Sequence, residues 1–313
     1  HTGRKLVAFP ADHPFYSYDD WFIGKTACNK GVPEEISSLT VTFQSCNIKS
    51  LKALFDQYPN QIAAVITEPE KPHCSNCDCS VSSQDYLQQA IELTQKNGAV
   101  FILDEMVSGF KVDFPGAISK YKLKPDLATW GKGIANGFSF CALTGKKDIM
   151  DLGGILAEGE EKVFLISSTH GGETNAIRAG IKTIEEFKNK NVIGHIYNIG
   201  NELIKRVKAL IIANELEAFI EMMPCPWMPS FIFKNKTGSV CNGHRTFFMQ
   251  EMIKENILFQ GIVVPSLSFT NNEMNHFLKG FESCIKKYKT ILKEGFTPHL
   301  KGTSTKPVFR KYN

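Results

Sequence analysis

The amino-acid sequence predicts an α/β fold in which a mainly parallel sheet lies between helices. Two observations support this prediction: helical and strand-like segments alternate along residues 49–103, and a carboxylate follows each strand-like segment. Such alternation is typical of parallel strands joined by crossover helices. The carboxyl ends of these strands meet at one edge of the sheet, where open α/β folds place their ligands. A functional site is therefore expected at that edge.

Apolar residues at helical spacing predict two helices in this part of the chain, and short apolar runs predict two buried strands. The first strand ends at Glu68 and the second ends at Asp104, so both carboxylates are expected at the carboxyl edge. A strand-like stretch after the glycine-rich segment 131–137 continues the sheet. The predicted elements are a helix over residues 49–58, a strand over 62–67, a helix over 85–97, and strands over 99–103 and 140–144.

The second part of the chain has a different texture. A mostly helical region is interrupted only at residues 191–194, and beyond it prolines surround short strand-like runs. We expect a large domain over residues 1–187, a small α+β domain over 188–298 and a tail over 299–313 that is an arm or disordered. The elements expected here are helices over residues 175–213 and 244–255, strands over 231–233 and 261–265, and an amphipathic helix over 271–292 capped by Asn271 or Asn272.

Composition narrows the function classes. The chain has 313 residues, which favours two domains, and its 42% hydrophobic and 22% charged residues are ordinary for a soluble globular protein. No apolar run approaches the roughly 20 residues of a membrane span. The net charge of +4 is spread along the chain, so neither a membrane nor a nucleic-acid partner is expected. Nine cysteines, most of them scattered singly, and no signal peptide favour the cytoplasm, and His1 suggests missing upstream sequence.

Two motifs contain the strongest candidates for chemistry. The first is Leu-Asp-Glu-Met-Val-Ser-Gly-Phe-Lys over residues 103–111, and the second is Pro-Asp followed by Gly-Lys-Gly over residues 125–133. Taken singly, Asp104 is more often a helix cap and Lys132 a solvated loop residue. Both motifs occurring in this order make chance a poor explanation.

Together the motifs resemble the class III aminotransferases, the fold type I group of pyridoxal phosphate (PLP) enzymes that includes the glutamate-1-semialdehyde aminomutases. The resemblance covers about residues 3–293 and implies a seven-stranded-type, mainly parallel sheet with a small C-terminal α+β domain. It also implies that Lys132 holds PLP as a Schiff base and that Asp104 pairs with the ring nitrogen. A lysine amine can form an imine and then carry a proton, and a carboxylate keeps the ring nitrogen protonated so that the ring withdraws electrons.

The same resemblance implies further contacts with the cofactor. Met106 lies where the family packs an apolar residue under the ring, and Ser108 is a nearby polar group. Core packing for Met106 and a turn hydroxyl for Ser108 are equally good accounts. Thr169, in Ser-Thr-His-Gly-Gly, matches a threonine that reaches the phosphate of the neighbouring subunit's cofactor, which implies a homodimer. Glu173-Thr174 replaces the usual Asn-Pro of that segment.

Candidates on the substrate side rest on weaker matches. Glu68-Pro69 matches a glutamate that faces the substrate, and His13 lies where the family has an aromatic-His-Gly segment. Asp12 occupies the position of the aromatic that stacks on the ring, so the stacking residue is Phe15 or Tyr16, or is absent. The partner expected is a small amine or amino acid.

Three cysteines crowd one segment, and two readings of it stay open. Cys74, Cys77 and Cys79 follow His73, but a metal site normally needs a second, distant ligand pair. An inserted loop near the site is therefore the favoured interpretation, and no metal is expected.

The sequence leaves the reaction open between aminotransferase and aminomutase. The alternative from another class is a non-catalytic remnant or partner subunit, because the family's phosphate-binding glycine-serine-threonine loop precedes the matching segment and Asp12 replaces the stacking aromatic. Retention of both Lys132 and Asp104 argues for the enzyme.

Overall fold

The computed structural model describes residues 1–12, 16–69, 83–154, 159, 161, 163, 169–309 and 311. The chain divides into two compact units. The first contains His1–Lys190 with Phe309–Asn313, and the second contains Asn191–Val308.

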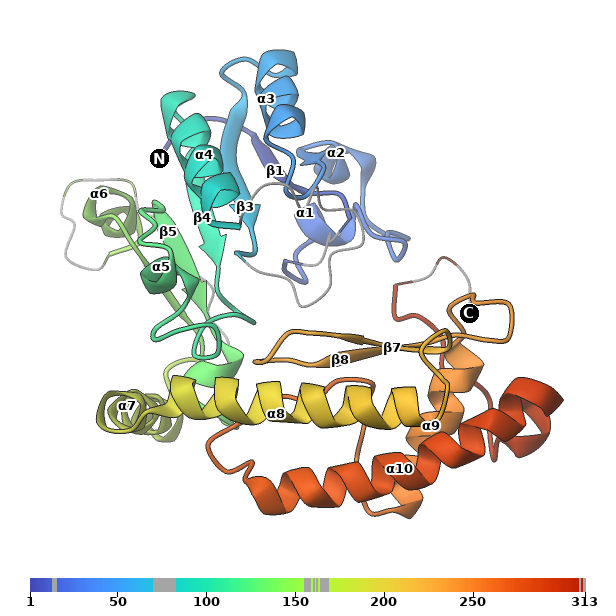
Figure 1. Ribbon diagram of the computed structural model, residues 1–313. Helices are drawn as coiled ribbons and strands as arrows, with labels where there is room; N and C mark the ends of the chain where they lie inside the picture. The colour runs from blue at the N-terminus through green and yellow to red at the C-terminus, as the bar shows by residue number, and fades with distance from the viewer. Residues whose placement is uncertain are drawn as a thin grey trace. The chain divides into compact units, whose positions relative to one another are not determined.

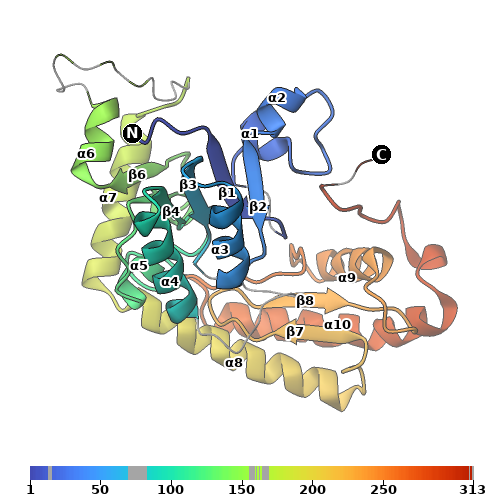
Figure 2. The same ribbon diagram turned by 90° about the horizontal axis from the view of Figure 1, so that it is seen from above.

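The first unit is built on a six-stranded sheet in the order β2-β1-β3-β4-β5-β6 (Figures 1 and 2). Every neighbouring pair from β2 to β5 is parallel, and only β6 runs antiparallel to its neighbour. The mainly parallel sheet predicted from the sequence is therefore confirmed. The strands are β1 (Leu6–Pro10), β2 (Thr40–Phe43), β3 (Ile62–Thr67), β4 (Val100–Asp104), β5 (Leu127–Trp130) and β6 (Ala142–Gly145).

Helices α3 and α4 pack against this sheet with their apolar sides (Figure 2). Leu51 of α3 and Leu87 of α4 are fully buried with Phe101 of β4 in one core, which gives each helix its orientation. The helices of this unit are α1 (Asp20–Ile23), α2 (Glu34–Ser37), α3 (Ile48–Gln57), α4 (Ser83–Lys96), α5 (Ala117–Lys120), α6 (Lys147–Met150) and α7 (Thr174–Asn189), with the 3-10 turns η1 (Lys132–Ile134) and η2 (Asp151–Gly153).

The second unit has its own core around a two-stranded antiparallel sheet. Three aromatic rings contact one another in this core: Phe233, Phe248 and Tyr288. The centroids of Phe233 and Phe248 are 4.8 Å apart, and each lies 6.0–6.3 Å from the centroid of Tyr288. Its elements are α8 (Val192–Ala213), β7 (Ile220–Met223), β8 (Ser230–Phe233), α9 (Asn242–Lys254), α10 (Asn271–Glu294) and the 3-10 turn η3 (Thr297–His299).

Two local predictions in this unit were wrong. The strand expected over residues 261–265 is only an isolated bridge between Ser230 and Ile262, because Pro229 and Pro265 have no N–H with which to extend a ladder. The cap of α10 is Thr270, not Asn271 or Asn272. Thr270 and Glu273 form a reciprocal capping box, which satisfies two backbone donors and is preferred over a single asparagine cap.

The described part of the tail lies against α9. The Lys301 N–H donates to the Gln250 side chain at 2.8 Å, and the Thr305 N–H donates to the Thr246 hydroxyl at 2.9 Å. These bonds hold an extended stretch that has little hydrophobic periodicity of its own.

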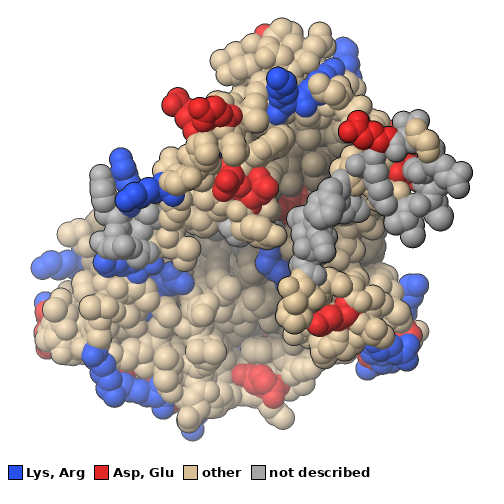
Figure 3. Space-filling view, turned by 180° about the vertical axis from the view of Figure 1, so that it is seen from behind, with Lys and Arg blue, Asp and Glu red and all other residues tan. Residues whose placement is uncertain are grey.

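Searching the described residues for a helix long and apolar enough to cross a membrane finds none. On the face shown in Figure 3, basic and acidic side chains alternate in small groups, as the modest net charge of +4 leads one to expect.

Candidate active site

Asp104 ends β4 at the carboxyl edge of the sheet and is 5% exposed. Its Oδ1 accepts a hydrogen bond from the Met106 N–H at 2.9 Å and another from the Thr129 hydroxyl at 3.0 Å. Hydrogen bonds donated to a carboxylate stabilise its negative charge, and Asp104 accepts two of them. The strand end therefore presents an oriented carboxylate at the edge where ligands bind.

Thr129 connects this carboxylate to the next strand. It is the register partner of Asp104 across the β4–β5 pair, and Lys132 follows three residues later along the same chain. The structure thus brings Asp104 and Lys132 to neighbouring strand ends. The role of Thr129 was missed in the sequence, where only the strand register could have identified it.

Lys132 begins the 3-10 turn η1, directly after β5, and its side chain is exposed. Its backbone has φ of +46°, in the left-handed region that lysine rarely adopts. Such a conformation costs about 1 kcal/mol or more and is concentrated at functional sites. The backbone is therefore strained at the residue that carries the amine.

Gly131, immediately before Lys132, lies against the end of a neighbouring side chain. A Cβ on Gly131 would lie 2.3 Å from Cε and 2.7 Å from Sδ of Met106, so Met106 packs directly against this backbone. Met106 and the lysine loop are therefore in contact. This contact accounts for the glycine through packing, because the extended φ of −168° at Gly131 is open to any residue.

Glu105, the residue after Asp104, belongs to the scaffold. It is fully buried, and its carboxylate accepts the Ile118 N–H at 2.8 Å and the Ser108 hydroxyl. Gly116 carries no side chain because a Cβ there would lie 2.6 Å from Oε1 of Glu105. The Ser108 hydroxyl is thus committed to Glu105, and a contact between Ser108 and a cofactor stays a prediction.

Lys111 is a second amine beside the lysine loop. Its Nζ donates to the Val107 carbonyl at 2.8 Å and lies 3.7 Å from the position a Cβ on Gly133 would take. Burial, with a smaller contribution from the charge of Lys132, lowers the pKa of Lys111 to about 8. No role was assigned to Lys111 from the sequence, where it reads as an exposed cation after a turn.

Tyr16 lies near both Glu68 and Asp104. Burial raises the pKa of Tyr16, and the charges of Glu68 and Asp104 raise it further, which requires the phenol to lie near both carboxylates. The Tyr16 ring packs near Phe9 of β1, with centroids 5.7 Å apart. Glu68 follows β3 and is half-buried. Three strands of the sheet therefore contribute to one polar cluster at its edge.

The remaining predicted residues are either exposed or outside the described part of the chain. Thr169 is exposed in a turn before α7, where the His170 Nδ1 and the Glu173 carboxylate lie 2.7 Å apart. His13, Phe15 and the segment with Cys74, Cys77 and Cys79 lie outside the described residues. Among the residues that are described, no group of three or more metal-binding side chains occurs.

This arrangement combines an oriented buried carboxylate, an exposed primary amine on a strained turn and an apolar Met106 side chain. A carboxylate of this kind can hold a protonated ring nitrogen, and an exposed amine can form an imine with an aldehyde. The donor set therefore fits an aromatic aldehyde that carries a basic ring nitrogen, which is the chemistry of PLP.

Comparisons with known proteins give the same picture. A family model described as aminotransferase class-III matches residues 24–220. The 3-aminobutyryl-CoA aminotransferase of Cloacimonas acidaminovorans is 29% identical over 260 residues, covering 83% of this chain and 59% of that protein. The glutamate-1-semialdehyde 2,1-aminomutase of Acidobacterium capsulatum is 36% identical over 197 residues, covering 60% and 44%. The chain spans about half the length of these curated relatives.

Solved structures extend the likeness of the fold. A structure described as a transaminase with PLP bound matches with a TM-score of 0.77 and 17% identity, covering 94% of this chain and 69% of that chain. At this identity the match shows the fold alone, and it confirms the PLP-transferase type of α/β fold expected from the sequence.

Proposed function

Because the chain belongs to the class III aminotransferase family, we propose that it forms the greater part of a PLP-dependent enzyme that transfers amino groups. The observation that supports this most directly is the link from Asp104 through Thr129 to Lys132. A threonine paired in register with the acid fixes the carboxylate and starts the short segment that leads to the amine. The two groups that PLP chemistry needs are therefore held at adjacent strand ends.

Each residue of this cluster has a role that follows from its position. PLP, when bound, supplies an electron-withdrawing ring that accepts the electrons released when a substrate carbon loses its proton. Lys132 would hold PLP through its amine and, once displaced by an incoming amine, would carry the proton between carbon atoms. Asp104 would keep the ring nitrogen protonated, because its own charge is stabilised by two donors.

Other contacts complete the proposal. Met106 would pack against the ring, since its side chain already lies against Gly131, and Ser108 would support the loop through Glu105. Thr169 would bind the phosphate held by a second copy of the chain, so we propose a homodimer. Glu68 and His13 would face a small amine or amino-acid substrate. We propose the cytoplasm as its location and the two compact units as its large and small domains.

The test is reduction of the purified chain with borohydride after incubation with PLP, followed by peptide mass mapping. The proposal predicts one phosphopyridoxyl adduct on Lys132, absent from Lys132→Ala and retained in Lys124→Ala, which removes an exposed lysine from the segment before β5. Adducts spread over many surface lysines, or none, would overturn it for this chain.

Transaminase and aminomutase activities separate in a second assay. A transaminase supplied with an amine donor releases a keto acid and stops until an acceptor is added. An aminomutase converts glutamate-1-semialdehyde to its isomer and needs no separate acceptor. Both activities would depend on Lys132, so Lys132→Ala is the negative control in each assay.

A second candidate function, a non-catalytic remnant or partner subunit, is favoured by Asp12. Asp12 holds the position of a stacking aromatic, and its carboxylate accepts both the hydroxyl of Ser45 at 2.5 Å and the Ser45 N–H at 3.2 Å. A side chain bonded in this way supports the loop after β2. No adduct on Lys132 after incubation with PLP would favour this second candidate.

A further inference from the structure

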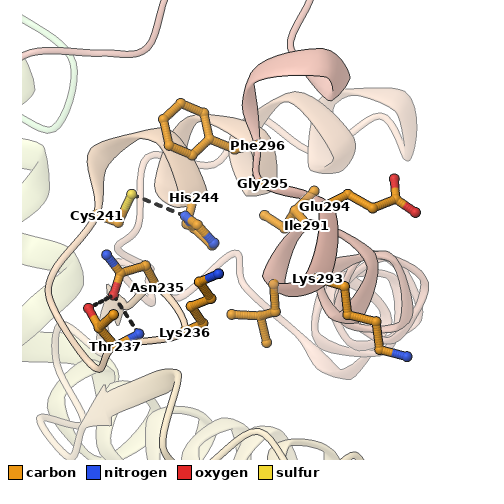
Figure 4. A pocket seen from close by; sticks show the side chains of 11 residues that line it. Asn235, Lys236, Thr237, Cys241, His244, Ile291, Lys293, Glu294, Gly295 and Phe296 are labelled. Atoms are coloured by element: carbon orange, nitrogen blue, oxygen red, sulfur yellow. Dashed lines mark hydrogen bonds between the residues drawn. The ribbon is translucent and has the colours of Figure 1, made fainter.

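The second unit contains a cavity that the proposed function does not use. It has a volume of about 300 Å³, at the lower end of the range for small-molecule sites. It is formed by the turn between β8 and α9, the first turn of α9, and the last turn of α10 with Phe296 (Figure 4). The residues used below are Asn235, Lys236, Cys241, His244, Ile291 and Phe296, all of which line it.

His244 is the buried polar group of this cavity. It is 4% exposed, and its Nε2 makes no hydrogen bond to any of the described residues. Its other ring nitrogen, Nδ1, lies 3.1 Å from Sγ of Cys241. Figure 4 shows Nε2 turned away from Cys241 toward the interior of the ring of lining side chains. A buried nitrogen without a partner costs about 1–3 kcal/mol, so a ligand that satisfied it would gain that amount.

The imidazole is held rigidly in this orientation. Its ring contacts Tyr288 at 5.4 Å and Phe296 at 5.6 Å between centroids, edge-on in both cases. Phe296 lies so close to α9 that a Cβ on Gly243 would be 2.4 Å from its ring. The Tyr288 hydroxyl in turn donates to the Lys234 carbonyl at 2.7 Å. The ring is therefore preorganised, and a ligand would bind without ordering it first.

The protonation of His244 follows from its neighbours. Burial lowers the pKa of His244, so the ring is neutral near pH 7. A thiol is a weak donor, and when Cys241 donates to Nδ1 the ring proton is on Nε2. The nitrogen that faces the cavity is then a donor and needs an acceptor.

The charge around the cavity favours a negative ligand. The ammonium end of Lys236 points toward the imidazole in Figure 4, whereas the Lys293 and Glu294 side chains point away from the cavity. The Glu294 carboxylate is paired with His299 at 2.9 Å. The first turn of α9 adds the positive end of a helix dipole, and its N-cap residue Cys241 makes no side-chain cap hydrogen bond.

The turn between β8 and α9, which carries Lys236, is held in a defined shape. The Asn235 side chain accepts hydrogen bonds from the Thr237 and Ser239 N–H groups at 3.0 and 3.1 Å, and Gly238 takes the left-handed φ of +79° that closes the turn. Opposite them, Ile291 and Phe296 give the cavity an apolar wall.

We propose that this cavity binds a small carboxylate with a short apolar chain, with the anion accepting from His244 Nε2 and pairing with Lys236. The apolar chain would lie against Ile291 and Phe296. This site is independent of PLP and of Lys132, because every residue in it belongs to the second unit.

The test uses butyrate as the probe and the His244 ring resonances as the readout, on the full-length chain carrying Lys132→Ala. The His244 signals are identified by their absence in His244→Phe, which keeps the aromatic packing and removes both nitrogens. We expect a saturable shift of the His244 resonances with butyrate. Lys236→Met should weaken binding about tenfold, the equivalent of 1.4 kcal/mol, whereas Lys293→Met should leave it unchanged.

Two further probes decide the chemistry. Butylamine, with the same apolar chain and the opposite charge, should give no shift of the His244 signals, and inorganic phosphate should bind more weakly than butyrate. No saturable response to butyrate, an equal response to butylamine, or unchanged binding in Lys236→Met would each overturn the proposal. If His244→Phe unfolds, the comparison of Lys236→Met with Lys293→Met decides it alone.

Discussion

The residues that flank β4 and β5 share one plan. After β4, Asp104 points to the edge of the sheet while its neighbour Glu105 is fully buried and accepts a backbone N–H. At β5, Lys132 is exposed at the edge while Asp126, at the other end of the strand, is 4% exposed and accepts the Phe101 N–H at 2.7 Å. Each segment therefore carries one residue with a proposed catalytic role and one acid that supports the scaffold.

This pairing shows why a motif match alone cannot separate an active enzyme from a silent relative. A remnant that keeps the fold would still need Glu105 and Asp126, because both satisfy buried backbone donors. By contrast, Lys132 is exposed, and Asp104 accepts the N–H of Met106, only two residues later in the chain. The sharpest tests therefore compare substitutions at Asp104 with substitutions at Glu105 and Asp126.

The largest effect is expected at Asp104. Asp104→Asn should slow amino-group transfer about 10²–10³-fold, because it removes one preorganised charge from the reacting ring. Its free energy of unfolding should change by less than about 1 kcal/mol, since the amide oxygen still accepts from Met106 and Thr129. The transfer rate and urea denaturation measure the two quantities. A loss of stability as large as the loss of rate would make Asp104 a scaffold residue.

Glu105 should behave in the opposite way. Glu105→Ala should lower the free energy of unfolding by about 3 kcal/mol, because it leaves the buried Ile118 N–H without an acceptor and opens space beside Gly116. Glu92→Ala, on the exposed side of α4, is the control and should change stability by less than about 0.5 kcal/mol. Equal urea midpoints for Glu105→Ala and Glu92→Ala would contradict the assignment of Glu105 to the scaffold.

Asp126 should show a smaller loss. Asp126→Asn keeps an oxygen for the Phe101 N–H but removes the ion pair with Lys146, whose Nζ lies 2.5 Å from Oδ1. The expected cost is about 1–2 kcal/mol, since Lys146 is half-exposed and solvent screens it. Lys146→Met removes the same pair, so the double variant should lose little more than Asp126→Asn alone. Additive losses would show that the pair is not the cause.

Lys111 should give the smallest effect, visible only as a function of pH. Its pKa of about 8 lies below the usual 10.5, so the folded state releases this proton first as pH rises. Below pH 8 the charged amine destabilises the fold, and this penalty disappears between pH 8 and 10.5. Lys111→Met should therefore lose stability relative to the native chain by on the order of 1 kcal/mol between pH 7 and 10.

The charge of Lys132 provides the check on this last prediction. The charge of Lys132 is the smaller of the two causes that lower the pKa of Lys111. Lys132→Ala should therefore raise the pH at which the change in stability is half complete. Lys124→Met, at an exposed lysine, should show no such pH-dependent difference from the native chain. If the difference in free energy of unfolding between Lys111→Met and the native chain stayed constant from pH 7 to 10, the lowered pKa of Lys111 would be excluded.

Most of the sheet was predictable from local pattern. The strand over residues 62–67 was predicted with its observed bounds, and α3 and α4 within one or two residues, because aliphatic runs and helical spacing are local signals. Asp104 and Lys132 were identified because each follows a buried strand within a recognisable motif. Both residues lie at the carboxyl ends of neighbouring strands.

The contacts that depend on register or on distant segments were not predictable. Thr129 bonds Asp104 only because β4 and β5 pair at that register. The cavity of the second unit joins Cys241 and His244 to Phe296, which shares no motif with them. A single sequence contains no local signal for contacts of this kind, since they arise from tertiary packing.

The position of β1 has a consequence for how the chain folds. β1 lies inside the sheet, between β2 and β3, and both Ala8 and Phe9 are fully buried there. Of the described strands it is the first to leave the ribosome, yet both of its partners come later in synthesis. Pairings that must wait for distant segments fold slowly and leave apolar strand edges open to aggregation. β1 therefore cannot be protected on both edges until residue 67, the end of β3, has been made.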